Sequence, residues 1–233
     1  MRSLDEVQRL VRERSPLPPA ETEDIIRKRY AALPRRLAFA LARWPLDRKR
    51  VLDIGCSWGH CLVHFGEGSV GIDSAAAHVE FCRALGLDAR VADANAGVDV
   101  PDHAFDYIWV SDVIEHLDAP RLLLRSVASK LKADGRLILF LTVLPRSRLA
   151  RTVLRRKGIR PFDAEAHHYQ FTCETATYMV ERAGYAVESV MVPFGGRTLA
   201  PLLRSATPRL YIEARPDAAA AALAAAAEAR NRG

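Results

Sequence analysis

The sequence predicts an α/β protein with a doubly wound, mostly parallel sheet of seven strands and helices on both faces. Short apolar segments typical of buried strands alternate with helical segments from residue 50 onward. The first five predicted strands recur at intervals of roughly 20–30 residues, which leaves room for a helical crossover between parallel strands. Acidic or glycine-containing turns follow the first three strands, as expected where such a sheet binds a ligand at one edge.

Two predicted helices precede the sheet and form an N-terminal helical cap over residues 1–46. The segment 3–14 carries apolar residues at helical spacing, and a proline-rich stretch ends it. The segment 21–43 predicts one continuous second helix that stops before Pro45. The main domain is then expected over residues 47–216.

The main domain contains seven predicted strands and four predicted helices. Right-handed crossovers bring the carboxyl ends of parallel strands to one edge of the sheet, where ligands bind. The predicted strands are 50–54, 69–72, 88–92, 105–111, 136–143, 185–193 and 209–214. The predicted helices are 60–65, 75–85, 120–131 and 172–184, and Asp134–Gly135 predicts a turn before the fifth strand.

Composition excludes several classes of protein. The 233 residues, 49% of them hydrophobic and 27% charged, suit one domain with a sizeable core. The net charge of +6 permits an anionic partner without requiring one. No apolar run approaches the ~20 residues of a membrane span, and no secretory signal is visible at the N-terminus. The cysteines lack metal-binding spacing, so reduced thiols and a cytoplasmic location are expected: they are Cys56, Cys61, Cys82 and Cys173.

Acidic residues lie at the ends of the first three strands. Asp53 precedes a turn whose glycines, Gly55 and Gly59, let the backbone bend sharply and approach a ligand closely. The turn does not match the GxGxxG pattern of dehydrogenases. Asp73 is placed where an acid can accept both hydroxyls of a ribose, although it can equally begin a helix. Asp93 can accept from an adenine amino group or lie in a solvated loop.

Together these motifs resemble those of the class I S-adenosylmethionine-dependent methyltransferases, in particular the methyltransferase type 11/12 and quinone-biosynthesis O-methyltransferase groups. The resemblance implies a Rossmann-like fold and says little about the acceptor. Trp58 departs from the pattern, because a glycine is commoner there. The matching segments are VLDIGCSWGH (51–60), VGIDSA (70–75), VADANA (91–96), FDYIWVSDVIEHLDAP (105–120), LKADGRLILF (131–140) and HHYQFTCETATYMVERAGYAVESV (167–190).

The resemblance implies that the residues after the strands bind S-adenosylmethionine. Asp53 would organise the turn and reach the cofactor amine, and residues of the cap would reach its carboxylate. The implied methionine-side residues are Gly55, Cys56, Gly59 and Ser111. The implied nucleoside-binding residues are Asp73 for the ribose and Asp93 with Ala94 for the adenine. The cap residues expected near the carboxylate are Tyr30, Arg35 and Arg36.

Histidines near the fourth strand and the last helix are candidate bases. Methyl transfer to a hydroxyl requires alignment of the acceptor and removal of a proton, and histidine titrates near neutral pH. The candidate catalytic residues are His116, His167 and His168; structural hydrogen bonding is the alternative for each. In some quinone-biosynthesis relatives two acids and a histidine bind a divalent metal, and the matching residues here are Asp112, Glu115 and His116.

Two further segments lie outside the alternating pattern. Residues 145–166 form an irregular, arginine-rich insertion in which Leu149 and its apolar neighbours would line one face of a short helix. This segment could cover an anionic acceptor, could contact an anionic membrane surface through residues 145–161, or could be a solvated basic helix. Residues 217–233 are mostly alanine and predict a helical tail.

The sequence therefore predicts a methyltransferase that acts on a small-molecule or glycan acceptor, with oxygen as the favoured target atom and an anionic acceptor a natural partner for the basic insertion. Transfer to nitrogen or carbon is one alternative. A non-catalytic, nucleoside-binding partner subunit is another. An RNA methyltransferase is disfavoured, because no RNA-binding module is recognisable and aromatic residues make up 7% of the chain. The oligomeric state is not predicted.

Overall fold

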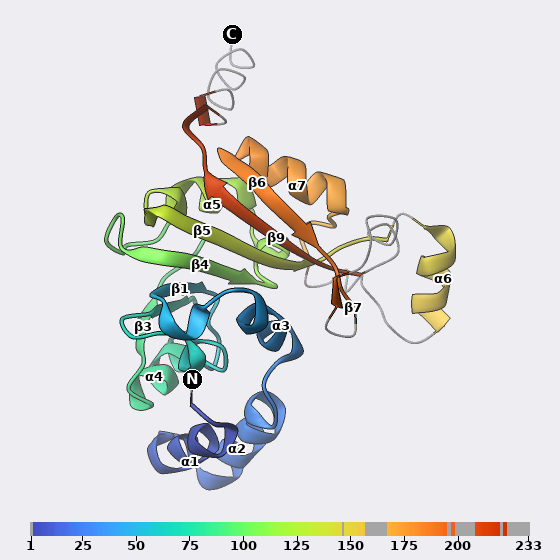
Figure 1. Cartoon of the computed structure of the whole chain (residues 1–233). Helices are drawn as coiled ribbons and strands as arrows, with labels where there is room; N and C mark the ends of the chain where they lie inside the picture. Colours follow the sequence, from blue (N-terminus) through green and yellow to red (C-terminus); the bar gives the residue numbers. More distant parts are fainter. Residues whose placement is uncertain are drawn as a thin grey trace.

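Seven strands form one sheet in the order β3-β2-β1-β4-β5-β9-β6 in the computed structural model (Figure 1). Residues 2–145, 147–156, 167–194, 197–198, 208–219 and 221–222 are described. Neighbouring strands are parallel except where β9 runs antiparallel to both β5 and β6, so the predicted mostly parallel sheet is confirmed. The strands are β1 (Val51–Ile54), β2 (Val70–Asp73), β3 (Asp88–Val91), β4 (Phe105–Ser111), β5 (Leu131–Thr142), β6 (Tyr185–Met191) and β9 (Arg209–Pro216).

The strand order reverses between β1 and β4, which makes their carboxyl ends the expected ligand-binding edge. Ile54 at the end of β1 pairs with Ile72 of β2 and with Val110 of β4, so the three strands end level with one another. The loops that leave these strands therefore begin at one place on the molecule.

The two faces of the sheet are covered by different helices. Leu137, Leu139 and Leu141 of β5 pack in the cluster that contains apolar residues of α5 (Pro120–Ala128) and α7 (Cys173–Arg182). The intervening Ile138 and Phe140 pack on the opposite face with residues of α3 (Arg35–Arg43) and with Trp44. The alternation follows from the two-residue period of a strand, and Figure 1 shows these helices on opposite sides of the sheet.

The N-terminal helices pack on α4 (Ala76–Ala84). The predicted single helix over 21–43 is wrong, because the chain breaks between Tyr30 and α3. Pro34 precedes α3 directly, and a residue before proline disfavours the helical conformation. The observed elements are α1 (Leu4–Arg14), α2 (Pro19–Ile25), the π-helical turn η1 (Ile26–Tyr30), α3 and the 3₁₀ turn η2 (Leu46–Arg48). The division of the chain into a cap and a main domain stays a prediction.

Several other boundaries differ from the predicted ones. The helix predicted over 60–65 is reduced to the 3₁₀ turn η3 (Leu62–His64). The predicted turn at Asp134–Gly135 lies inside β5, at a place where the pairing between β4 and β5 shifts register. Another 3₁₀ turn, η4 (Ile114–His116), follows β4.

The basic insertion contains one described helix, α6 (Arg148–Arg156), which stands apart from the sheet in Figure 1. Residues 157–166 and most of the alanine-rich tail lie outside the described part of the chain. Residues 193–194 and 197–198 form a short hairpin, β7–β8. Within the described residues, no helix has both the length and the apolar character that crossing a membrane requires.

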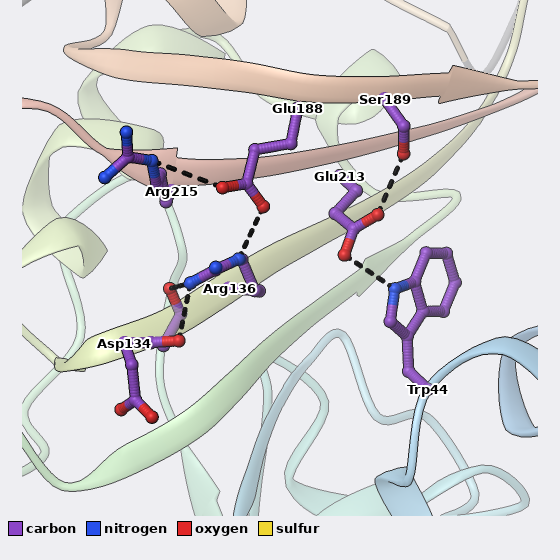
Figure 2. Close-up of polar contacts among 8 residues, drawn as sticks. Trp44, Asp134, Arg136, Glu188, Ser189, Glu213 and Arg215 are labelled. Atoms are coloured by element: carbon purple, nitrogen blue, oxygen red, sulfur yellow. Dashed lines mark hydrogen bonds and ion pairs between the residues drawn. The ribbon is translucent and has the colours of Figure 1, made fainter.

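On the face of the sheet that α3 covers, polar contacts join neighbouring strands to one another and to the end of α3 (Figure 2). Trp44, just past the end of α3, donates from its indole nitrogen to Glu213 Oε1 of β9 at 2.8 Å, and Ser189 of β6 donates to the other oxygen of the same carboxylate at 2.8 Å. Glu188 of β6 is paired with Arg136 of β5 at 2.5 Å and with Arg215 of β9 at 3.2 Å. Each glutamate thus connects two neighbouring elements through both of its oxygens.

Candidate active site

The turn after β1 requires its glycines. Gly55 and Gly59 have φ angles of 73° and 72°, in the left-handed region that other residues avoid. A Cβ at Gly55 would collide with the side chain of Val113, and a Cβ at Gly59 would lie 2.8 Å from the Cys82 sulfur. The amides of Gly55 and Cys56 both donate to the Ile72 carbonyl, at 2.8 and 2.9 Å. The turn is therefore tied to the end of β2.

Asp73 at the end of β2 connects this turn to helix α4. Its Oδ2 accepts from the Ser57 amide at 2.8 Å, and its Oδ1 accepts from the Ala75 amide at 2.9 Å. The His78 ring, on α4, lies with Nδ1 at 3.1 Å from the same Oδ1. Asp73 does not cap α4, because the N-cap of that helix is Ala75, which has no side-chain capping bond. The Asp73 carboxylate instead joins the turn to the segment before α4, at the expected ligand-binding edge.

Asp53 is buried at the base of the turn, beside groups that come from the cap. Burial raises the pKa of Asp53 to about 7, against the opposing effect of the nearby Arg36 cation. Arg36 donates from Nη2 to His60 Nε2 at 2.8 Å, and burial lowers the pKa of His60 to about 3. Because arginine can only donate, the His60 hydrogen must lie on Nδ1.

Three buried polar atoms of this group have no hydrogen-bond partner within the described structure: Arg36 Nε, Asp53 Oδ2 and His60 Nδ1. Two of them are donors and one is an acceptor. An unsatisfied buried polar atom costs about 1–3 kcal/mol, so such a set indicates a site for a ligand that carries both charges. An amino acid has this pattern, with a carboxylate for the donors and an ammonium group for Asp53.

Of the three cap residues expected near a carboxylate, Arg36 bonds to His60, and its cation acts on the Asp53 carboxyl. Tyr30 is buried, and its hydroxyl instead donates to the carbonyl of Trp58 in the turn. Arg35 is exposed. Tyr30 therefore holds the shape of the turn from the cap side.

The residues predicted for the adenine lie in the loop after β3. Asp93 is exposed, and its Oδ1 accepts from the backbone amide and the side-chain amide of Asn95, at 2.9 and 3.2 Å. Asn95 Oδ1 in turn accepts from the Asp118 amide at 2.9 Å, which joins this loop to the segment after η4. Ala94 is partly buried against the main core. On the methionine side, Cys56 is buried, and Ser111 Oγ is buried without a hydrogen-bond partner among the described residues.

Two of the three candidate histidines face each other. The rings of His116 and His167 pack edge to face with their centres 4.7 Å apart. Potential ligand atoms of Glu115, His116 and His167 all lie within 4.8 Å of one another. His168 is directed elsewhere, because its Nδ1 lies 3.0 Å from Asp118 Oδ1.

Glu115 is the buried member of this histidine group. Burial raises the pKa of its carboxyl. Its Oε1 accepts from the Thr142 amide at 3.3 Å, whereas Oε2 is buried without a partner among the described residues. A buried carboxylate oxygen without a donor, next to two imidazoles, suits a divalent cation as the missing partner.

Asp112 is engaged by a residue that the sequence analysis did not single out. Arg209 donates from Nη1 to Asp112 Oδ1 at 2.7 Å and to Thr142 Oγ1 at 2.9 Å. Arg209 begins β9, and because β9 is antiparallel, its first residue lies at the edge where the parallel strands end. Arg209 could have been predicted at this edge only if the antiparallel direction of β9 had been known, and the local sequence does not show that direction. His60 and His78 were not predicted as site residues either; the sequence favours a packing role for His60.

A family model described as a methyltransferase domain matches residues 25–190, which include most of the chain and every site residue described above except Arg209. The chain belongs to the class I S-adenosylmethionine-dependent methyltransferases. This assignment confirms the resemblance drawn from the sequence motifs, and it makes S-adenosylmethionine the cosubstrate that the family implies.

Curated relatives and solved structures agree with this assignment. The methyltransferase is 32% identical over 127 residues to ubiquinone biosynthesis O-methyltransferase of Xanthomonas oryzae pv. oryzae, covering 51% of this chain and 52% of the relative. It therefore spans about half the length of the relatives of this group. The protein of the same description from Xanthomonas euvesicatoria pv. vesicatoria is 30% identical over 175 residues, 69% of this chain and 72% of that one.

The fold is also that of solved methyltransferases. An S-adenosylmethionine-dependent methyltransferase from Thermotoga maritima, described as a possible histamine N-methyltransferase, superposes with a TM-score of 0.62 at 18% identity. The superposition covers 85% of this chain and 96% of that one. At this identity the likeness concerns the fold alone.

Proposed function

We propose that this methyltransferase transfers the methyl group of S-adenosylmethionine to an oxygen atom of a small-molecule or glycan acceptor. The observation that carries the proposal is the Glu115–His116–His167 group, which follows β4 at the edge where the parallel strands end. A neutral imidazole there can take the proton that an acceptor hydroxyl loses during an in-line methyl transfer. The names of the curated relatives support oxygen as the target.

The proposed cofactor position follows from the polar atoms around the turn after β1. The ammonium group would bind Asp53, and the carboxylate would bind Arg36 and His60, which supplies partners for the three unsatisfied atoms. This requires α3 to yield slightly, because those atoms are buried in the free protein. The turn residues Gly55, Cys56 and Gly59, with Ser111, would line the methionine chain. Asp73 would bind the ribose, and Asp93 with Ala94 would border the adenine.

A divalent cation is proposed as a second component of the acceptor site. Glu115, His116 and His167 fit it, given the unsatisfied Glu115 Oε2. The resemblance implies a different ligand set, namely Asp112, Glu115 and His116. For that set to bind a cation, the ion pair between Asp112 and Arg209 would first have to break. When bound, such an ion would occupy ring nitrogens of His116 and His167, and it would lower the pKa of an acceptor hydroxyl in place of proton removal by either histidine. Mn²⁺ binding followed by electron paramagnetic resonance tests this, and weaker binding in His167→Gln than in Asp112→Asn is expected.

The function is tested by incubating the protein and S-adenosylmethionine with catechols, carboxylated phenols and anionic sugars, with products identified by mass spectrometry and NMR. We expect an O-methyl product. His167→Gln should lower kcat by about 100-fold or more if His167 is the base. His103→Gln, an exposed histidine at the opposite edge of the sheet, is the matched control.

Products methylated only at nitrogen or carbon, or on RNA, would contradict the proposal. His168→Gln tests the remaining candidate base.

We also propose that residues 145–161 contact an anionic membrane surface. The described part supports this: on α6, Leu149 is 74% exposed and Val153 is 43% exposed, and Arg148, Arg151 and Arg156 around them are exposed as well. Exposed apolar residues among arginines suit an anionic interface. Residues 157–161 lie outside the described structure. A cytoplasmic location is proposed with this contact, and the four reduced cysteines support it.

Vesicle flotation tests the membrane contact. The protein should float with phosphatidylglycerol vesicles and not with phosphatidylcholine vesicles, and Leu149→Glu/Val153→Glu should stay at the bottom. Leu122→Glu, at a 56% exposed leucine of α5, is the matched control and should float as the wild type does. Equal flotation of all variants would contradict a role for α6.

A further inference from the structure

The Asp73 carboxylate has little hydrogen-bonding capacity left. A carboxylate offers about four acceptor positions, two on each oxygen. On Oδ1, both are taken, by the Ala75 amide at 2.9 Å and by His78 Nδ1 at 3.1 Å. On Oδ2, one is taken by the Ser57 amide at 2.8 Å. One position therefore remains, on Oδ2.

A ribose presents two hydroxyl groups, and both need a partner when they are buried. Asp73 alone can accept from one of them without losing an existing bond. The two backbone amides that it binds belong to the turn and to the start of α4, so releasing either would disturb the frame of the site. The His78 ring is the one partner on a side chain that can rotate.

A hydroxyl group can replace the direct contact between His78 and Asp73, because it both donates and accepts. Placed between the two side chains, it would donate to Asp73 Oδ1 and accept from His78 Nδ1–H, so neither group loses a partner. The contact is reachable, since the His78 and Asp73 side chains are 28% and 13% exposed. We infer that His78 is a second ribose-binding residue, which holds one hydroxyl of the cofactor ribose together with Asp73.

The ring of Trp58 supports the ring of His78. It packs on the His78 ring with centres 4.5 Å apart and meets Phe81 edge to face at 5.1 Å. We expect this contact to keep the His78 ring beside Asp73 when a hydroxyl enters between the two side chains.

The inference rests on the proposed cofactor role of Asp73, and the experiment separates the two. Binding of S-adenosylhomocysteine and of its 2′-deoxy and 3′-deoxy analogues is measured by calorimetry for the wild type and for variants. His78→Phe removes the donor and keeps a ring against Trp58, and it should weaken binding of S-adenosylhomocysteine by about 3- to 10-fold. His78→Asn, whose amide can take the place of Nδ1–H, should stay within about 2-fold of the wild type.

The deoxy analogues show whether His78 acts on a hydroxyl. Removing the hydroxyl that His78 holds should weaken binding to the wild type more than binding to His78→Phe. The effects of the deoxy analogue and of the substitution should therefore not be additive. Glu80→Ala, an exposed position on the same helix, is the matched control and should bind as the wild type does. If His78→Phe does not fold, His78→Leu replaces it in the same comparison.

The outcomes separate cleanly. A wild type that binds no S-adenosylhomocysteine overturns the proposed function and this inference with it. Binding that needs Asp73 but is unchanged in His78→Phe overturns the inference alone. Equal losses in His78→Phe and His78→Asn, or fully additive effects with both analogues, also overturn it, because they indicate a packing role for the ring.

Discussion

At the scale of single residues, Asp53 has the most consequential environment in the site. Burial at the base of the turn raises the pKa of its carboxyl from an ordinary value near 3.8 to about 7, so the folded protein keeps a proton that the unfolded chain releases. Stability must therefore fall as pH rises between about 4 and about 7, and the penalty is complete above that range. The protein retains a carboxylate here at the expense of stability, which favours a binding role.

Asp53→Asn should remove this pH dependence. The variant, without ligand, should gain stability relative to the wild type as pH rises, with about 1–3 kcal/mol of relative gain between pH 5 and pH 8. Urea denaturation across that range measures the difference. Asp99→Asn, at an exposed aspartate, should show a flat difference. A gain for Asp53→Asn that is the same at every pH would contradict the burial of a protonated carboxyl.

At the scale of elements, α3 is held at both ends. At its beginning Arg36 contacts His60, and the Arg36 carbonyl accepts from the Tyr211 hydroxyl of β9 at 2.6 Å. Just past its end, Trp44 bonds to Glu213 of the same strand (Figure 2). The helix that carries a proposed carboxylate-binding residue is thus positioned by β9 as well as by the turn.

Trp44→Phe should test this anchoring. Loss of the indole donor, together with some buried area, should lower the free energy of unfolding by about 1–2 kcal/mol. The loss stays this small because Ser189 still donates to the Glu213 carboxylate. The loss is measured as the change in the midpoint of urea denaturation, provided that the dependence of the unfolding free energy on urea is the same in both proteins. Ser189→Ala, which removes the other donor from the same carboxylate, is the matched comparison and should cost less because no large side chain is truncated. An unchanged midpoint in Trp44→Phe would show that the contact contributes nothing.

At the scale of the whole molecule, cofactor binding and folding are coupled. A ligand that binds the native state alone, at 100 times its Kd, adds about 2.7 kcal/mol to stability. For a domain of this size that corresponds to roughly 5–10 °C in Tm. We expect S-adenosylhomocysteine to produce such a shift in the wild type and to lose most of it in Asp73→Ala at the same concentration. Equal shifts in both proteins would contradict the role of Asp73.

The sequence predicted much of this molecule because its signals are local. The alternation in β5 and the acids at the ends of β1, β2 and β3 can be read from neighbouring residues, so the sheet and the positions of Asp53, Asp73 and Asp93 could be predicted. Long-range contacts could not. Nothing near Asp112 shows that Arg209 will pair with it, and nothing near His60 shows that Arg36 will. Pro34 is a local signal for a helix break, but the helical spacing of apolar residues over 21–43 led to the prediction of one continuous helix.

The position of β9 has a consequence for the order in which the sheet can be completed. In the sheet β6 pairs with β9 and not with β5, so β6 leaves the ribosome before the strand that joins it to the rest. Until residues 209–216 have been synthesised, β5 presents an open edge, the place where misassembly between chains begins. Arg209 and Tyr211 arrive with the same strand. A nascent chain can therefore form β1, β2 and β3, where we propose that the nucleoside binds, before the proposed acceptor side is complete and α3 is fixed by β9.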